Sequence, residues 1–138
     1  MTEKRDVWQE FFDRRFTTYN LGRPAVFLIP LRCLYFKDQR HKGKTIEQTL
    51  DKFLATNFTA FTKTKIPSFG IWRNHQGVLE SDECVQYEVS FVGKEFVKTL
   101  MARVAEIARI TGEQCIYFKA GEDSCLIYPV TSPSRRKP

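Results

Sequence analysis

Histidines and carboxylates near expected turns are the residues of this chain that could first be considered for chemistry. His75 stands in a turn-like segment shortly before Asp82 and Glu83, and a hairpin could bring these three side chains together. Such a cluster would serve acid–base catalysis or a weak divalent-cation site, although solvated turn residues explain the same pattern. Asp38 could hold the metal ion of a nuclease if two copies of the chain met there. None of these residues follows a defined motif, so the sequence leaves enzymatic activity uncertain, favours its absence, and predicts no catalytic residue, metal or cofactor.

The cysteines follow none of the common metal-binding patterns. They stand at positions 33, 84, 115 and 125, without the close pairing that zinc sites require. Their apolar neighbours predict buried free thiols in a reducing compartment. A disulfide between Cys115 and Cys125, on two strands flanking a short turn, is the alternative.

Positive charge is the clearest functional signal, because the net charge is +6 and two segments concentrate it. Phosphate contacts need only mobile positive charge, so these segments predict nucleic-acid binding, with a solvated loop and a solubilising tail as the alternative. Segment 26–31 loosely resembles the first strand of RNA-recognition domains, but the third strand lacks their glycine-rich octamer. The predicted contact residues are Lys37, Arg40, His41, Lys42, Lys44, Arg135, Arg136 and Lys137.

Size and composition predict a single globular domain. The chain has 138 residues, of which 42% are hydrophobic and 28% charged, enough to build a core. No apolar run approaches the ~20 residues of a membrane-spanning helix, and the charged start is not followed by the apolar stretch of a secretory signal. We therefore expect a cytoplasmic protein that does not associate with membranes.

Hydrophobic periodicity predicts the elements that must position these residues. Apolar spacings of three and four indicate helices, whereas alternation or continuous apolar runs indicate strands. Thr45 and Gln48 form a capping box, Pro30 should bend or split its strand, and Gly112 should end the last helix. The predicted elements are helices at 4–19, 45–60 and 94–110 and strands at 25–36, 68–73, 78–92, 115–119 and 124–130.

This order predicts an α+β fold, a ferredoxin-like β-α-β-β-α-β sandwich with an extra N-terminal helix and an added C-terminal strand. The single domain would span 1–130, with its ferredoxin-like core at 25–130 and a basic flexible tail at 131–138. One sheet face needs a cover, supplied either by the N-terminal helix or by a second copy in a homodimer. Large aromatic residues that could anchor a protein partner are Trp8, Phe12 and Trp72, although burial in the core is the commoner role of such residues.

These features lead to one functional hypothesis and two alternatives. The first is a small non-enzymatic regulatory or accessory protein that self-associates and binds an acidic partner, with nucleic acid as the leading candidate. The second is a protein-binding inhibitor or adaptor, of the kind that phages and mobile elements encode, without nucleic-acid contact. The third is a metal-dependent nuclease.

Overall fold

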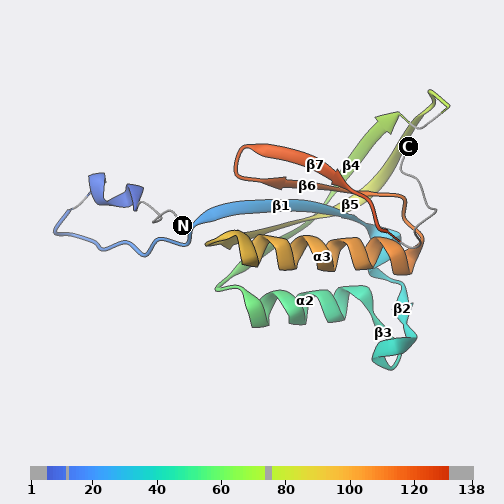
Figure 1. Ribbon diagram of the computed structural model, residues 1–138, viewed down its shortest axis with the longest axis horizontal. Coiled ribbons are helices and arrows are strands. Elements are labelled where there is room, and N and C mark those ends of the chain that lie inside the picture. The colour runs from blue at the N-terminus through green and yellow to red at the C-terminus, as the bar shows by residue number, and fades with distance from the viewer. Residues whose placement is uncertain (1–5, 12, 74–75, 131–138) are drawn as a thin grey trace.

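A computed structural model describes residues 6–11, 13–73 and 76–130, without the side chains at 66–68 and 72. Five antiparallel strands form one sheet in the order β4-β5-β1-β6-β7, and helices α2 and α3 cover one face of it (Figure 1). The sheet strands are β1 (Arg23–Pro30), β4 (Phe61–Arg73), β5 (Leu79–Phe91), β6 (Ile116–Ala120) and β7 (Asp123–Ile127). The long helices are α2 (Ile46–Asn57) and α3 (Lys94–Thr111). The predicted α+β class is confirmed.

Between β1 and α2 the chain makes a short helix and a small hairpin that projects beside the two long helices. The short helix is α1 (Leu31–Leu34), and the hairpin consists of β2 (Lys37–Asp38), the 3-10 turn η2 (Gln39–His41) and β3 (Lys44–Thr45). The predicted strand 25–36 is therefore wrong in its second half. Pro30 ends β1, because proline lacks the N–H group that a continuing strand would need for pairing.

The core lies between the sheet and the two long helices. Phe27 stacks on Tyr87 and on Phe118, with ring centroids 5.2 and 6.1 Å apart, and all three rings are buried. The hydrophobic stripes of both helices close over these rings. Alternating burial of Val85, Tyr87 and Val89 on β5 confirms the inward face that the sequence predicted.

Both long helices begin and end close to where the sequence placed them. The capping box at the start of α2 is complete: the Gln48 amide donates to the Thr45 hydroxyl at 3.2 Å, and the Gln48 side chain accepts from the Thr45 amide at 2.9 Å. Gly112 ends α3 with a φ of 78°, in the left-handed region that glycine adopts without strain. Local capping chemistry therefore marks the start of α2 and the end of α3.

An ion-pair network fastens α2 to the sheet. Lys63 on β4 contacts Asp51 and Glu47 of α2, and Lys65 contacts Glu47 at 2.8 Å. The buried Tyr87 hydroxyl donates to Asp51 at 3.2 Å. Burial, followed by the nearby carboxylates, raises the pKa of Tyr87, so this phenol stays protonated and acts as a donor. These charges have partners within the fold, so we treat the network as structural.

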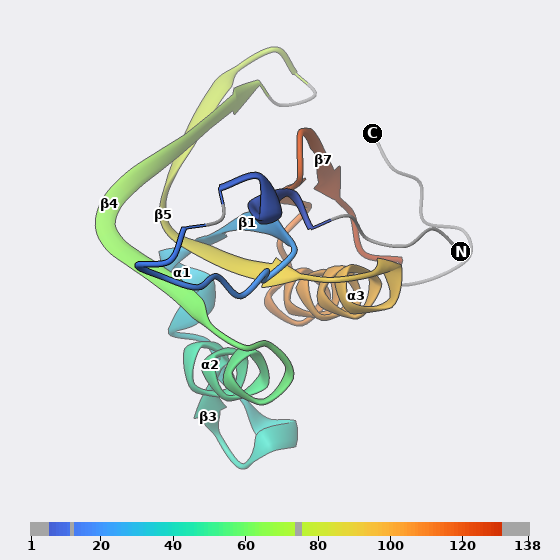
Figure 2. The same cartoon turned by 90° about the vertical axis from the view of Figure 1, so that its left-hand side faces the viewer.

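The β4–β5 hairpin bends away from the sheet and extends beyond it (Figure 2). The pairing of β4 with β5 shifts register between Thr64 and Ser68, a segment that contains Pro67. Proline cannot donate to the ladder, and a bulge of this kind increases local twist. The hairpin beyond the bulge exposes Phe69 and Ile71, which are 62% and 67% accessible. The strand predicted at 68–73 is therefore only the outer half of β4.

The predicted N-terminal helix 4–19 is wrong over its described part. Only Val7–Phe11 is helical, as the 3-10 turn η1, and an isolated bridge joins Asp13 to Phe16. Trp8 and Phe11 are 45% and 59% exposed, so the aromatic stripe has no surface to pack on, and a short helix gains most of its stability from such packing. The segment points away from the domain (Figure 1). It does not cover the second sheet face, where Tyr117 and Leu126 remain accessible.

In the part of the chain that the structure describes, no helix is long and apolar enough to cross a bilayer.

Candidate functional site

The five basic residues predicted at 37–44 all lie on the β2–η2–β3 hairpin. Asp38, proposed from the sequence as a metal ligand, organises this hairpin from a buried position, 4% exposed. Its carboxylate accepts from the Arg40 amide at 3.0 Å, and its carbonyl accepts from the Gly43 amide at 3.1 Å. Burial would raise the pKa of Asp38, but the hydrogen bonds from Arg40 outweigh it and lower the pKa. Asp38 is therefore engaged in holding the hairpin.

The acid–base cluster that the sequence suggested at the hairpin turn is not assembled. Asp82 and Glu83 are consecutive in β5, so their side chains point to opposite faces of the hairpin, and His75 lies outside the described residues. Among residues 6–11, 13–73 and 76–130 no group of three or more histidine, cysteine, aspartate or glutamate side chains could hold a metal ion.

The predicted free thiols are present at all four positions, and Cys115 and Cys125 are not joined. Cys33 and Cys84 are buried as expected, whereas Cys125 is exposed on the edge strand β7.

Most of the remaining predicted site residues lie outside the described part of the chain. Arg135, Arg136, Lys137 and Phe12 lie outside the described residues, as does the side chain of Trp72. The Trp8 ring lies beside the Phe11 ring, with ring centroids 6.2 Å apart, and 45% of Trp8 is exposed. Its role as an anchor for a partner stays a prediction.

The structure assembles a charged cluster that the sequence gave no reason to suspect. Arg32 on α1 contacts Glu113, after α3, at 2.6 Å and Asp82, on β5, at 3.5 Å. The Glu113 side chain is 8% exposed, whereas Arg32 keeps 59% of its side chain accessible. We call these three residues the Arg32 cluster. It combines a buried carboxylate, a half-buried carboxylate and a guanidinium that faces solvent.

Local contacts hold Glu113 in place. Its amide donates to the Ala108 carbonyl at 2.9 Å as part of the helix end around Gly112. The Cys33 thiol lies 3.7 Å from the Glu113 carboxylate and 3.3 Å from the Thr111 hydroxyl. Burial raises the pKa of Cys33 to about 11, so this residue remains a neutral thiol donor rather than a nucleophile.

Electrostatics fix the charge state of the guanidinium. Burial would lower the pKa of Arg32, but the carboxylates of Glu113 and Asp82 outweigh it and raise the pKa further. Arg32 is therefore a permanent cation with one side committed to carboxylates and another open to solvent. An open guanidinium beside a carboxylate can bind the two charges of an α-amino acid group, carboxylate to guanidinium and ammonium to carboxylate.

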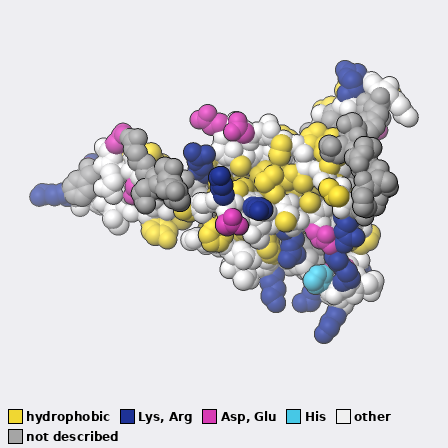
Figure 3. All heavy atoms as spheres, in the orientation of Figure 1, with side chains coloured by type: hydrophobic (Ala, Val, Ile, Leu, Met, Phe, Trp, Pro, Cys, Tyr) yellow, Lys and Arg dark blue, Asp and Glu magenta, His cyan; other side chains and the backbone are white. Residues whose placement is uncertain are grey.

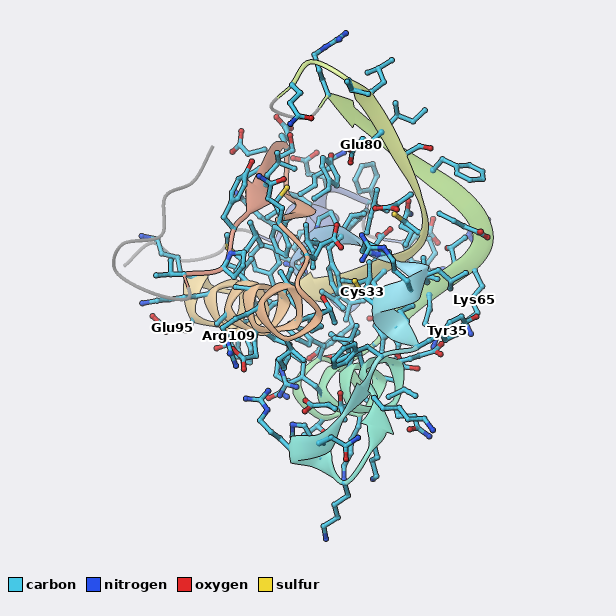
Figure 4. All side chains as sticks on the ribbon, turned by 90° about the vertical axis from the view of Figure 1, so that its right-hand side faces the viewer. Cys33, Tyr35, Lys65, Glu80, Glu95 and Arg109 are labelled. Atoms are coloured by element: carbon cyan, nitrogen blue, oxygen red, sulfur yellow. The ribbon has the colours of Figure 1, made fainter. Side chains whose placement is uncertain are left out.

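The Arg32 cluster lies where the projecting hairpin leaves the sheet. Figure 4 shows Cys33 on α1 beside the base of the β4–β5 hairpin, with Glu80 farther along the hairpin. Asp82 and Glu80 share one face of β5, because they are two residues apart in a strand. The carboxylates of Asp82 and Glu80 therefore lie along one face of the hairpin, and Asp82 is the one that contacts Arg32. Positions 32, 82 and 113 are far apart in the chain, so no spacing rule could have found them.

The comparisons with known proteins give one result. No family model matches the chain, and no curated protein matches its sequence. A solved structure of a phage SAM lyase in complex with S-methyl-5′-thioadenosine matches with a TM-score of 0.56 and 15% sequence identity, over 87% of this chain and 99% of that chain. The apo state of a phage SAM lyase matches with a TM-score of 0.55 and 15% identity, over 85% of this chain and 98% of that chain. The similarity extends over the fold as a whole.

These neighbours correct the sequence-based functional hypothesis. A non-enzymatic regulatory protein that binds nucleic acid is contradicted, because the proteins that share this fold over nearly their full length are enzymes. Net basicity misled the prediction, since excess positive charge identifies no partner unless a defined surface presents it.

Proposed function

We propose that this protein is an enzyme that cleaves S-adenosylmethionine and releases S-methyl-5′-thioadenosine. The observation that carries the proposal is the structural similarity to phage SAM lyase, which includes 99% of that chain. The strand order of this chain also favours the finer, ferredoxin-like description of the fold, with β1 and β5 near the centre of the sheet. Fold alone does not determine activity, so the proposal also needs a site with the right chemistry.

The Arg32 cluster has charges that complement this substrate. S-adenosylmethionine carries a sulfonium and an ammonium cation and one carboxylate, so its net charge is positive. The open side of Arg32 would bind the substrate carboxylate, and Asp82, which pairs with Arg32 at 3.5 Å and keeps 23% of its side chain exposed, would also accept from the ammonium group. Glu113 holds the guanidinium from the buried side and acts as a positioning residue. The carboxylates on this face of the hairpin also attract the sulfonium.

The reaction itself demands little from the protein. When the bond between the sulfur and the γ-carbon breaks, its electron pair moves to sulfur and the leaving group becomes a neutral thioether. The γ-carbon regains a pair either from the substrate's own carboxylate, closing a lactone, or from a β C–H bond, whose proton passes to a carboxylate of the site acting as a base. Neither route consumes water. A neutral thioether departs without protonation, so no general acid is required.

The test is incubation of the purified protein with S-adenosylmethionine, followed by chromatography and mass spectrometry. We expect S-methyl-5′-thioadenosine to form in amounts equal to the substrate consumed. Arg32→Ala should lower kcat/KM by about 10- to 100-fold, because it removes a charge-assisted contact. Arg32→Lys should recover part of this loss through KM. Lys98→Ala, on the exposed side of α3, is the matched control and should behave as wild type.

Two results would reject the proposal in different ways. Absence of S-methyl-5′-thioadenosine with folded wild-type protein would reject the activity. Normal cleavage by a folded Arg32→Ala variant would keep the activity but remove the Arg32 cluster as its site.

A further inference from the structure

A second surface of the molecule, separate from the Arg32 cluster, is shaped and charged to hold a ligand. Helices α2 and α3 flank a groove that the β2–η2–β3 hairpin closes at one end. Two adjoining hollows of about 470 and 540 Å³ share Arg40, His41, Thr49, Phe53 and Arg103 among their lining residues. Together they are as large as typical small-molecule sites.

The rim of this groove carries more positive than negative charge. Five cations line it, against the two carboxylates of Asp38 and Glu106. Arg40 is 3.0 Å from Glu106 and 3.4 Å from Asp38, so these two carboxylates already have partners. Among the described residues no carboxylate lies within ion-pair distance of the other rim cations, which are Lys42, Lys44, Lys52 and Arg103. Figure 3 shows lysine and arginine side chains gathered around the cyan histidine at this end.

Two of the rim lysines, Lys42 and Lys44, lie on backbone that is fixed by hydrogen bonds of the small hairpin. Lys42 has a φ of 60°, which is costly for a residue with a side chain, and its amide donates to the Gln39 carbonyl at 3.2 Å. The backbone of Lys44 on β3 lies opposite that of Asp38 on β2 in the small two-stranded sheet. Positive charge presented from fixed backbone positions binds an anion at lower entropic cost than mobile charge does.

The groove also has a flat aromatic platform beside its cations. The Arg103 guanidinium lies over the Phe53 ring, 4.3 Å from the centroid, and both residues line the hollow of about 470 Å³ as well as its neighbour. Stacked in this way, the guanidinium has a second planar face on which a nucleobase can stack. Gln48 and Asn57 add amide groups to the same lining. Lys52, which directly precedes Phe53 on α2, lines the same hollow.

We propose that the α2–α3 groove binds a nucleoside triphosphate, with its base on Arg103 and its phosphates at Lys42, Lys44 and Lys52. Three lysines that line one hollow suit the several charges of a triphosphate, and the adjoining guanidinium suits its base. The positively charged substrate proposed for the Arg32 cluster is disfavoured here by repulsion. The groove is therefore a separate ligand site, and it does not depend on the lyase assignment.

The test is isothermal titration calorimetry of the full-length protein at physiological ionic strength. The ligands are ATP, tripolyphosphate, adenosine and a short single-stranded oligonucleotide. We expect saturable binding of one ATP per chain, weaker binding of tripolyphosphate, and the weakest binding of adenosine. A combined K42E/K44E/K52E variant should lose at least about tenfold in ATP affinity, because it reverses the charges assigned to the phosphates.

Matched variants separate the two parts of the site. Arg103→Ala should weaken ATP about tenfold and leave tripolyphosphate nearly unchanged, since it removes the stacking face. Lys94→Glu with Lys98→Glu, on α3 outside the groove, should leave both ligands unchanged. Circular dichroism verifies that each variant is folded.

Four outcomes would overturn the proposal. These are no saturable ATP binding, ATP binding unaffected in folded K42E/K44E/K52E protein, equal affinities for ATP and tripolyphosphate, and an oligonucleotide that displaces ATP and binds more tightly. The last two would reassign the groove to bare polyphosphate and to single-stranded nucleic acid, respectively.

Discussion

The Arg32 cluster and the α2–α3 groove use arginine in opposite ways. In the cluster one guanidinium is held against two carboxylates, and Glu113 is almost completely buried. In the groove Arg40 neutralises the available carboxylates, and three lysines on the rim stay exposed. The first arrangement suits a substrate with both charges, and the second suits a polyanion. The net charge of the whole chain, +6, therefore predicts neither region.

The largest effect is expected from breaking the Arg32 cluster. Arg32→Ala should slow S-adenosylmethionine cleavage by up to about 100-fold and also lower the unfolding free energy by about 1–3 kcal/mol, because the buried Glu113 carboxylate loses its cationic partner. Enzyme assays and urea unfolding measure the two losses. A double variant with Glu113→Gln should regain part of the stability without regaining activity. Recovery of activity as well would show that Arg32 acts on structure alone.

The next effect tests whether the two regions are independent. Reversing charge at Lys44 and Lys52 should reduce ATP affinity about tenfold while cleavage of S-adenosylmethionine stays within twofold of wild type. Calorimetry and the cleavage assay on the same preparation decide this. A parallel loss of ATP affinity and of cleavage rate would show that the groove and the substrate site are not independent.

These expectations depend on contacts that the sequence only partly revealed. Helix α2 was predictable because Thr45 and Gln48 carry their own capping chemistry, and Gly112 marked the end of α3 in the same local way. The N-terminal helix failed because its aromatic stripe needs a surface that the fold does not supply. Local signals determine element boundaries, whereas packing decides whether an element forms.

The Arg32 cluster was beyond prediction for a different reason. Its three residues come from α1, β5 and the end of α3, and each is ordinary in its own segment. The proposed reaction also predicts no catalytic sequence motif. The sulfonium substrate releases a neutral thioether, so the protein needs no general acid for the leaving group. The basic hairpin was found from the sequence, but its ligand class depends on Phe53 and Arg103, which only the folded chain brings beside it.

A smaller effect is expected from the cap that joins the basic hairpin to α2. Thr45→Ala removes the hydroxyl that accepts the Gln48 amide, and should lower the unfolding free energy by about 1 kcal/mol. Thermal unfolding measures the change as a lower Tm. Because Lys44 precedes this cap directly, we also expect slightly weaker ATP binding and unchanged cleavage. Thr49→Ser, which can keep its bond to the Ile46 carbonyl, is the matched control for the change in Tm.

The smallest effect concerns acid stability. The hydrogen bond from Arg109, with that from Arg40, lowers the pKa of Glu106 to about 2, from 4.5 for the ordinary group. A carboxyl with a lowered folded pKa stabilises the fold above its unfolded pKa and loses that stabilisation as pH falls toward its folded pKa. As the pH falls from 4.5 to 2, the Tm of the wild-type protein should therefore decrease by more than the Tm of the Glu106→Gln variant. Equal losses would show that the exposed Glu106 pair contributes nothing.

The most direct measurement for the account is the rate at which purified protein releases S-methyl-5′-thioadenosine from S-adenosylmethionine, compared between wild type, Arg32→Ala and the K42E/K44E/K52E variant. The account predicts release equal to substrate consumption in wild type, a loss of 10- to 100-fold in Arg32→Ala, and unchanged release in the lysine variant. No release by folded wild-type protein would contradict its central claim.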